Sequence, residues 1–100
     1  MRLDKMATAL REARTSFGLD MTDVLILDDV VRKRKQMGEV TIMEIIDSCD
    51  AASPATVHAR IKRLCENGFL RKDVHPSNLR VRVLDTHDEY DKLVKRLGVL

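Results

Sequence analysis

The segment "SPATVHARIKRLCENGFL", residues 53–70, constrains the fold more than any other part of the chain. It opens with Ser53, a favoured helix N-cap residue, and Pro54 follows at the first helical position, where its missing N–H costs nothing. The apolar residues that come next are spaced as on one stripe of a helix: Val57, Ile61 and Leu64. Gly68 is a helix stop signal, so the sequence predicts a helix from residue 53 to about residue 67.

Directly after this helix, the spacing of apolar residues changes from the helical repeat to the two-residue repeat of strands. "FLRKDV" and "LRVRVL" are typical of two strands, and "HPSN" between them is typical of a turn. In the second strand, Val81 and Val83 alternate with Arg80 and Arg82, which gives one apolar face and one basic face. Residues 69–84 are therefore predicted to form a β-hairpin with a basic outer face.

Two helices are predicted before residue 38. Residues 3–14 carry apolar side chains at three- and four-residue intervals, and "TSFGLD" then interrupts the pattern. A second helix begins at Asp20 or Thr22, either of which can cap it, and runs to about Met37. Its apolar residues lie on more than one side, which is typical of a central helix that others surround.

Further cap signals frame the remaining helices. "EVT" is a candidate short strand, and Thr41 with Glu44 three residues later forms a capping box for a short third helix that ends near residues 49–52. After the hairpin, Thr86 and Glu89 form the same pattern before a closing helix. Its apolar stripe belongs either to the core or to a dimer seam, and the nearby chain end favours the seam: Tyr90, Leu93, Val94 and Leu97.

The order of these elements is that of a helix-turn-helix followed by a hairpin. In such a unit the first helix braces the second, and the second enters the DNA major groove by its N-terminal end. The small, polar start "SPAT" allows close approach of the backbone, and free N–H groups there favour phosphate. Helical spacing predicts an outward face with two flanking residues, His58 and Arg60. The outward residues are Ala55, Thr56, Ala59, Lys62, Arg63 and Glu66.

The charge distribution favours a polyanionic partner. The net charge is only +2, but residues 1–50 carry −2 and residues 51–100 carry +4. Between Ser53 and Leu84, seven basic residues stand against two acidic ones. With two Phe, one Tyr and no Trp, a nucleic-acid surface cannot depend on aromatic stacking. A solvated helix face is the alternative explanation for the cations of residues 53–67.

Other function classes find little support in the sequence. It has no glycine-rich phosphate loop and no defensible catalytic set, so we expect no enzyme. Cys49 and Cys65 have no metal-ligand spacing, and we expect reduced, structural thiols, no metal and no cofactor. No signal peptide or span of roughly 20 apolar residues is present, which predicts a cytoplasmic protein without a membrane partner.

The segment "SPATVHARIKRLCENGFLRKDVHPSNLRVRVLDTHDEY" resembles the winged helix-turn-helix of MarR-type transcriptional regulators. The similar features are "SPATV" at the start of the recognition helix, "IKRLCENGFL" leading into the wing, and an arginine-rich return strand. Upstream, "GLDMTDVLILDDVVRKRKQMGEVTIMEI" resembles the bracing helix and the lead into the first helix of the reader pair. The resemblance covers roughly residues 18 to 90.

This resemblance implies a regulator that binds double-stranded DNA, usually as a homodimer on a near-palindromic operator. Transferred position by position, it assigns residues of the recognition helix to the bases, namely Ser53, Thr56, His58 and Ala59. It assigns three cations to phosphates or groove edges, namely Arg60, Lys62 and Arg63. It assigns the wing to Arg80 and the tip residues His75, Ser77 and Asn78.

We therefore expect one domain over residues 1–100, mainly α (α+β), with a winged helix-turn-helix, a small β-hairpin wing and flanking N- and C-terminal helices. The expected function is sequence-specific binding of double-stranded DNA by a small transcriptional regulator, with helix 53–67 in the major groove and wing 75–80 on the backbone or minor groove. The expected homodimer joins the closing helix to the N-terminal helix. The alternative is a winged-helix interaction module, such as a replication or packaging adaptor, with an acidic protein partner.

Overall fold

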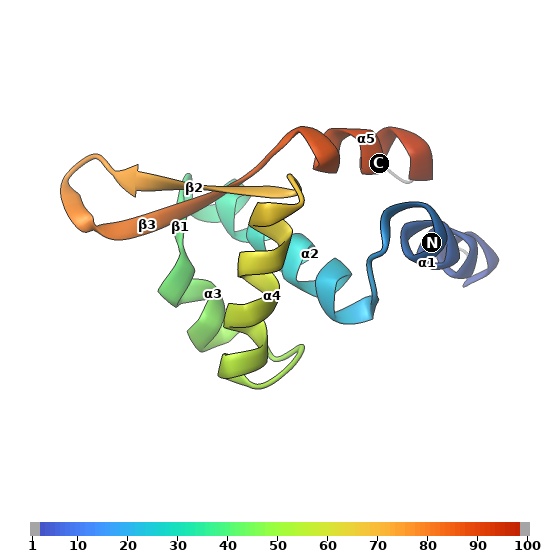
Figure 1. The fold of residues 1–100 in the computed structure, drawn as a ribbon, viewed down its shortest axis with the longest axis horizontal. Coiled ribbons are helices and arrows are strands. Elements are labelled where there is room, and N and C mark those ends of the chain that lie inside the picture. The colour runs from blue at the N-terminus through green and yellow to red at the C-terminus, as the bar shows by residue number, and fades with distance from the viewer. Residues whose placement is uncertain (1–2, 99–100) are drawn as a thin grey trace.

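Five helices and three strands follow one another in the computed structural model, which describes residues 3–98 (Figure 1). The elements before the hairpin are α1 (Leu3–Phe17), α2 (Met21–Met37), β1 (Val40–Thr41), α3 (Ile42–Ser48) and α4 (Pro54–Glu66). The remaining ones are β2 (Leu70–His75), β3 (Asn78–Thr86) and α5 (Asp88–Leu97). The mainly α winged helix-turn-helix predicted from the sequence is confirmed, and α1 continues three residues beyond its predicted end.

Side-chain caps fix the starts of α2, α3 and α4. The Asp20 side chain accepts a hydrogen bond from the Asp23 N–H at 3.0 Å, and Asp23 accepts one from the Asp20 N–H at 3.1 Å. Thr41 and Glu44 form the predicted capping box at the start of α3, with both distances 3.1 Å. Ser53 caps α4 by accepting from the backbone N–H three residues later. Local sequence signals therefore set these three boundaries.

The capping box predicted at the start of α5 is wrong. Thr86 is the last residue of β3, where it pairs with Leu70, and the N-cap position is taken by His87. The N–H groups near this helix start instead donate to carbonyls after α4: His87 N–H to Phe69 O and Glu89 N–H to Gly68 O, each at 3.0 Å. Strand pairing holds Thr86 in the sheet, so the tertiary structure overrides the local cap pattern.

The strands form one antiparallel sheet in the order β1-β3-β2. Val40 pairs with Leu84, and the hairpin register places Val74 opposite Arg82, with a bulge between Val74 and His75. Val83 is buried while Arg82 is exposed, as the alternation in the sequence predicted. The hairpin projects away from α1 and α5, so its turn lies at the opposite end of the molecule from these two helices (Figure 1).

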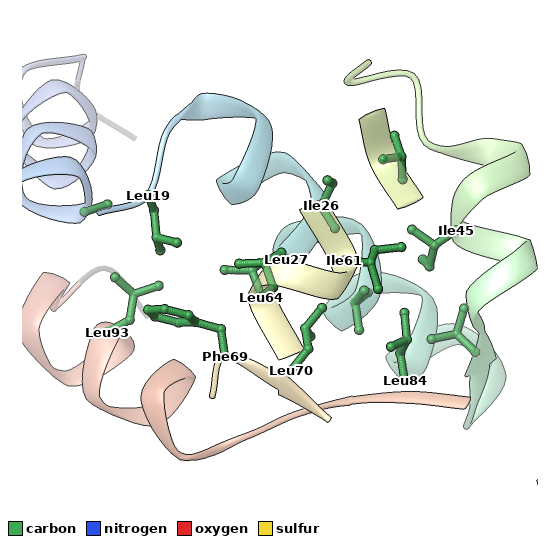
Figure 2. Packing of buried hydrophobic residues seen from close by; sticks show 14 residues of the cluster. Leu19, Ile26, Leu27, Ile45, Ile61, Leu64, Phe69, Leu70, Leu84 and Leu93 are labelled. Atoms are coloured by element: carbon green, nitrogen blue, oxygen red, sulfur yellow. The ribbon is translucent and has the colours of Figure 1, made fainter. Parts of the chain in front are cut away.

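The core lies between α2, α3, α4 and the sheet (Figure 2). The fully buried residues include Ile26 and Val30 of α2, Ile45 of α3, and the predicted stripe of α4. Leu93 of α5 extends this core near Leu19 and Phe69, as Figure 2 shows. An ion pair between Arg96 and Glu12 adds a link between α5 and α1. Within residues 3–98, no helix is long and apolar enough to cross a membrane.

Candidate nucleic-acid interface

Helix α4 presents one side that the rest of the fold does not cover. Val57, Ile61 and Leu64 are buried against the core and fix the rotation of the helix about its axis. The positions on the opposite side are exposed: Ala55, Ala59, Lys62, Arg63 and Glu66. Of the predicted base-contacting residues, Ser53, His58 and Ala59 are also exposed, and Thr56 is half-buried.

The first turn of α4 is pre-organised by its own side chains. The Ser53 hydroxyl accepts from the Thr56 N–H at 3.3 Å and donates to the Thr56 hydroxyl at 3.0 Å. The two predicted contact residues are therefore brought together. The residues at this end are small, so the backbone of the first turn can approach a duplex closely.

Arg60 and Arg63 have partners that sequence reasoning missed. Arg60 Nη1 lies 2.6 Å from Asp20 Oδ2 and 3.2 Å from Asp23 Oδ1, and Arg63 Nη2 lies 2.9 Å from Asp23 Oδ2. The Asp23 side chain is fully buried, whereas the Arg63 side chain remains 48% exposed. The available signal was the matched spacing of two acids at the start of α2 and two arginines three residues apart on α4.

The ion pair between Asp20 and Arg60 makes the stability of the fold depend on pH. The hydrogen bond from Arg60, followed by that from the Asp23 N–H, lowers the pKa of Asp20 from 3.8 to about 2. A carboxyl group with a lowered pKa stabilises the folded state above its ordinary pKa and loses that contribution as the pH falls through the folded value. We expect the difference in unfolding free energy between the wild type and Asp20→Asn to be constant above pH 5 and to shrink between pH 3.8 and about 2.

Urea unfolding of both proteins at a series of pH values measures this difference. Asp20→Asn is a suitable reference because asparagine is also a favoured N-cap residue, so the start of α2 is kept. A difference that persists unchanged down to pH 2 would show that the carboxylate charge contributes nothing.

The wing turn is held by local hydrogen bonds. The Ser77 N–H donates to His75 Nδ1 at 3.0 Å, and His75 Nε2 lies 3.2 Å from Glu39 Oε1. The Arg80 N–H donates to Asn78 Oδ1 at 3.0 Å. The four predicted wing residues are thus placed around one turn, with His75 directed toward the loop before β1.

The basic face of the hairpin is partly neutralised at its base. Arg71 lies 3.2 Å from Asp73 and 3.4 Å from Asp85, and Arg34 of α2 lies 3.1 Å from Asp85. Arg82 donates to the Leu79 carbonyl at 2.7 Å. Of the seven cations between Ser53 and Leu84, four make no side-chain ion pair with any residue of 3–98: Lys62, Lys72, Arg80 and Arg82. Fewer cations are therefore available than the sequence count indicated.

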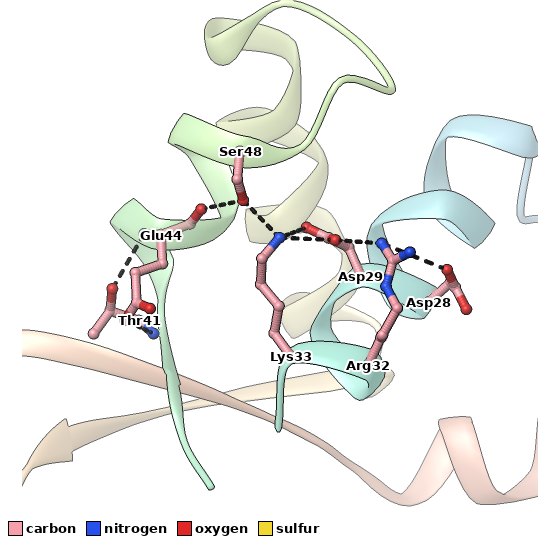
Figure 3. A network of polar contacts seen from close by, with 7 residues as sticks. All are labelled: Asp28, Asp29, Arg32, Lys33, Thr41, Glu44 and Ser48. Atoms are coloured by element: carbon pink, nitrogen blue, oxygen red, sulfur yellow. Dashed lines mark hydrogen bonds and ion pairs between the residues drawn. The ribbon is translucent and has the colours of Figure 1, made fainter. Parts of the chain in front are cut away.

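A second polar network joins α2 to α3 (Figure 3). The buried Asp29 carboxylate accepts from Lys33 Nζ at 2.8 and 2.9 Å and from Arg32 Nη2 at 2.8 Å. Lys33 Nζ also donates to the Ser48 hydroxyl of α3 at 2.6 Å. One buried carboxylate of α2 therefore supports α3, and another, Asp23, supports α4.

The apolar stripe of α5 divides between core and surface. Leu93 is buried, whereas Tyr90, Val94 and Leu97 are half-buried along a groove between α5 and α2. Burial raises the pKa of Tyr90. Helix α1 leaves apolar side chains uncovered nearby, with Leu3 78% and Met6 41% exposed.

The cysteines and histidines form no further site in the described part of the chain. Cys49 and Cys65 are free thiols, each half-buried, and burial raises the pKa of Cys65. Within residues 3–98, no group of three or more His, Cys, Asp or Glu side chains lies together as a metal site would require.

Comparison with solved structures identifies the class of fold. A mutant of MepR from S. aureus, bound to an oligodeoxyribonucleotide, matches 95% of this chain and 66% of its own with a TM-score of 0.75 and 14% identity. Sco3205 from Streptomyces coelicolor, a MarR family transcriptional regulator in complex with DNA, matches 96% of this chain and 61% of its own with a TM-score of 0.68 and 15% identity. No protein-family model and no curated protein sequence matches.

A third structure, a MarR-like transcription regulator from Bacillus cereus, matches 96% of this chain and 68% of its own with a TM-score of 0.67 and 13% identity. At such low identity the similarity shows the fold, which is the winged helix-turn-helix of MarR family regulators. The resemblance read from the sequence is confirmed at this level. The chain spans about two thirds of the length of these structures.

Proposed function

We propose that this chain binds double-stranded DNA in a sequence-specific manner and regulates transcription. Helix α4 enters the major groove by its N-terminal end, and wing residues 75–80 contact the backbone or the neighbouring minor groove. The observation that supports this most directly is the uncovered side of α4. It is small and polar at its start, and farther along it carries Lys62, which has no ion-pair partner among residues 3–98. Structures with this fold include some bound to DNA, such as that of Sco3205.

The proposal divides the roles between side chains. Ser53, Thr56, His58 and Ala59 approach the base edges, because they lie in the first two turns of α4. Lys62 of α4 and Arg80 of the wing neutralise phosphates. Arg60 and Arg63 mainly hold α4 against the start of α2 through their ion pairs with Asp20 and Asp23. His75, Ser77 and Asn78 fix the conformation of the wing turn.

We further infer a homodimer whose interface is formed by α5 and α1 of each subunit. Helices α1 and α5 lie at the end of the molecule away from the wing (Figure 1). Helix α5 carries the half-buried apolar stripe, and α1 carries the exposed Leu3 and Met6. Apolar faces of this kind are covered in a stable assembly. A twofold dimer predicts an operator with two inverted half-sites. We infer a cytoplasmic regulator without catalytic activity.

Selection of bound sites from random duplexes tests the function. We expect an inverted repeat to be enriched, and the logarithm of its affinity to fall with the logarithm of salt concentration by about 0.9 for each phosphate contact. A gel-shift series at low salt in which no duplex is retarded would contradict the proposal. Recovery of single half-sites would support DNA binding but contradict the dimer.

A further inference from the structure

Two carboxylates at the start of α2 neutralise two of the three cations of α4. Asp20 and Asp23 face Arg60, and Asp23 also faces Arg63, all within 3.2 Å. Within residues 3–98, this leaves Lys62 as the cation of α4 without a carboxylate partner. The net charge of this cluster is therefore +1 instead of +3.

The carboxylates are well placed to keep this pairing. The Asp23 side chain is fully buried, and the reciprocal hydrogen bonds of the capping box hold both acids at the start of α2. The Arg60 side chain is 25% exposed, so it lies largely within the joint between α2 and α4. Arg63 projects from the outer side of α4, next to Lys62, and its guanidinium group is turned back toward Asp23.

We propose that Asp20 and Asp23 limit the sequence-independent affinity for DNA by holding Arg60 and Arg63 away from the phosphate backbone. This inference rests on the proposed function. Phosphate contacts supply the affinity for any duplex, whereas base contacts discriminate between sequences. Two restrained arginines withdraw two possible phosphate contacts, which lowers the affinity for a duplex of any sequence. Binding then depends more strongly on the base contacts made by the first turns of α4.

Isosteric amides test the proposal with the full chain. Asp20→Asn and Asp23→Asn each remove one negative charge and keep an oxygen acceptor for the backbone of the capping box. Asp29→Asn is the matched control, because it also removes one negative charge from a buried carboxylate of α2, but one that pairs with Lys33 and Arg32 instead of α4. The probe is a short random-sequence duplex, titrated at salt concentrations between about 50 and 200 mM.

We expect each released arginine to steepen the salt dependence by about 0.9 and to raise the affinity for the random duplex about eightfold near 0.1 M salt. Asp29→Asn keeps the wild-type slope. A merely structural role of Asp23 would lower stability without steepening the slope, so the slope separates the two possibilities.

Wild-type slopes in folded Asp20→Asn and Asp23→Asn would overturn the inference, and so would an equal change in Asp29→Asn. If Asp23→Asn fails to fold, Asp20→Asn decides, because its replacement keeps the cap and removes the closer partner of Arg60. Arg60 then keeps only the 3.2 Å contact with Asp23, so we expect a slope between the wild-type value and that of one full additional contact, and a wild-type slope would overturn the inference. If the wild type itself retards no duplex, the proposed function fails and the inference falls with it. Binding by the wild type with unchanged variants would overturn the inference alone.

Discussion

Replacing both Lys62 and Arg80 with alanine is expected to weaken duplex binding roughly sixtyfold near 0.1 M salt, and each single replacement about eightfold. Both side chains are exposed, and neither makes an ion pair within the described chain, so both are free to neutralise a phosphate. Because the two residues lie on different elements, α4 and the wing, their effects should be nearly additive. Each loss should also make the salt dependence shallower by about 0.9.

Fluorescence anisotropy of a labelled duplex over a salt series measures both quantities. Lys95→Ala on α5 is the matched control, since it removes one exposed cation from the end of the molecule that lies away from the wing (Figure 1). We expect its affinity to stay within about twofold of the wild type, because distant surface charges are screened. Light scattering should show the same oligomeric state for all variants. If the double variant binds as Lys95→Ala does, the interface has been assigned to the wrong side of the fold.

The two helices of the helix-turn-helix, α3 and α4, could be predicted from the sequence because the signals for their starts are local. Thr41 with Glu44 and Ser53 with Pro54 mark helix starts within three residues, and each of these caps is present in the structure. The spacing of apolar residues after Gly68 likewise indicates the hairpin, because the side chains on one face recur at every second residue in a strand and at every third or fourth residue in a helix. Order and spacing of these elements then indicated the fold.

Partner choice between distant side chains could not be predicted in the same way. Arg60 and Arg63 are about forty residues from Asp23, and their pairing exists only because α2 and α4 pack together. Sequence reasoning therefore treated Arg60 and Arg63 as free cations and assigned Asp23 no partner. Thr86 is the reverse case, in which a correct local pattern for a helix cap lost to strand pairing with Leu70.

The number of cations available to a partner also depends on contacts between residues that are distant in the sequence. From Ser53 to Leu84 the sequence offers seven basic residues, but Arg60, Arg63 and Arg71 have carboxylate partners in the folded chain. The charge totals thus predicted a polyanionic partner. The structure shows which of these cations already pair with carboxylates and which remain available to contact that partner. The roles of individual residues at the bases stay predictions until binding is measured.

Leu64→Ala is expected to lower the free energy of unfolding by about 2–5 kcal/mol. Leu64 is 1% exposed and lies near Leu27 and Ile61 in the centre of the core (Figure 2). Removing its side chain leaves a cavity between α4 and α2 that rigid neighbours fill only in part. Urea denaturation followed by circular dichroism at one fixed protein concentration measures the change, because a dimer would make stability depend on concentration.

Leu79→Ala provides the control, because the same atoms are removed from a side chain that is 77% exposed in the wing. Its unfolding free energy should stay within about 0.5 kcal/mol of the wild type. Equal losses in the two variants would mean that Leu64 does not pack as described. Leu64 also fixes the rotation of α4, so DNA affinity measured on the folded fraction of Leu64→Ala should fall as well. Packing of one leucine thereby links the stability of the domain to the direction in which its recognition helix faces.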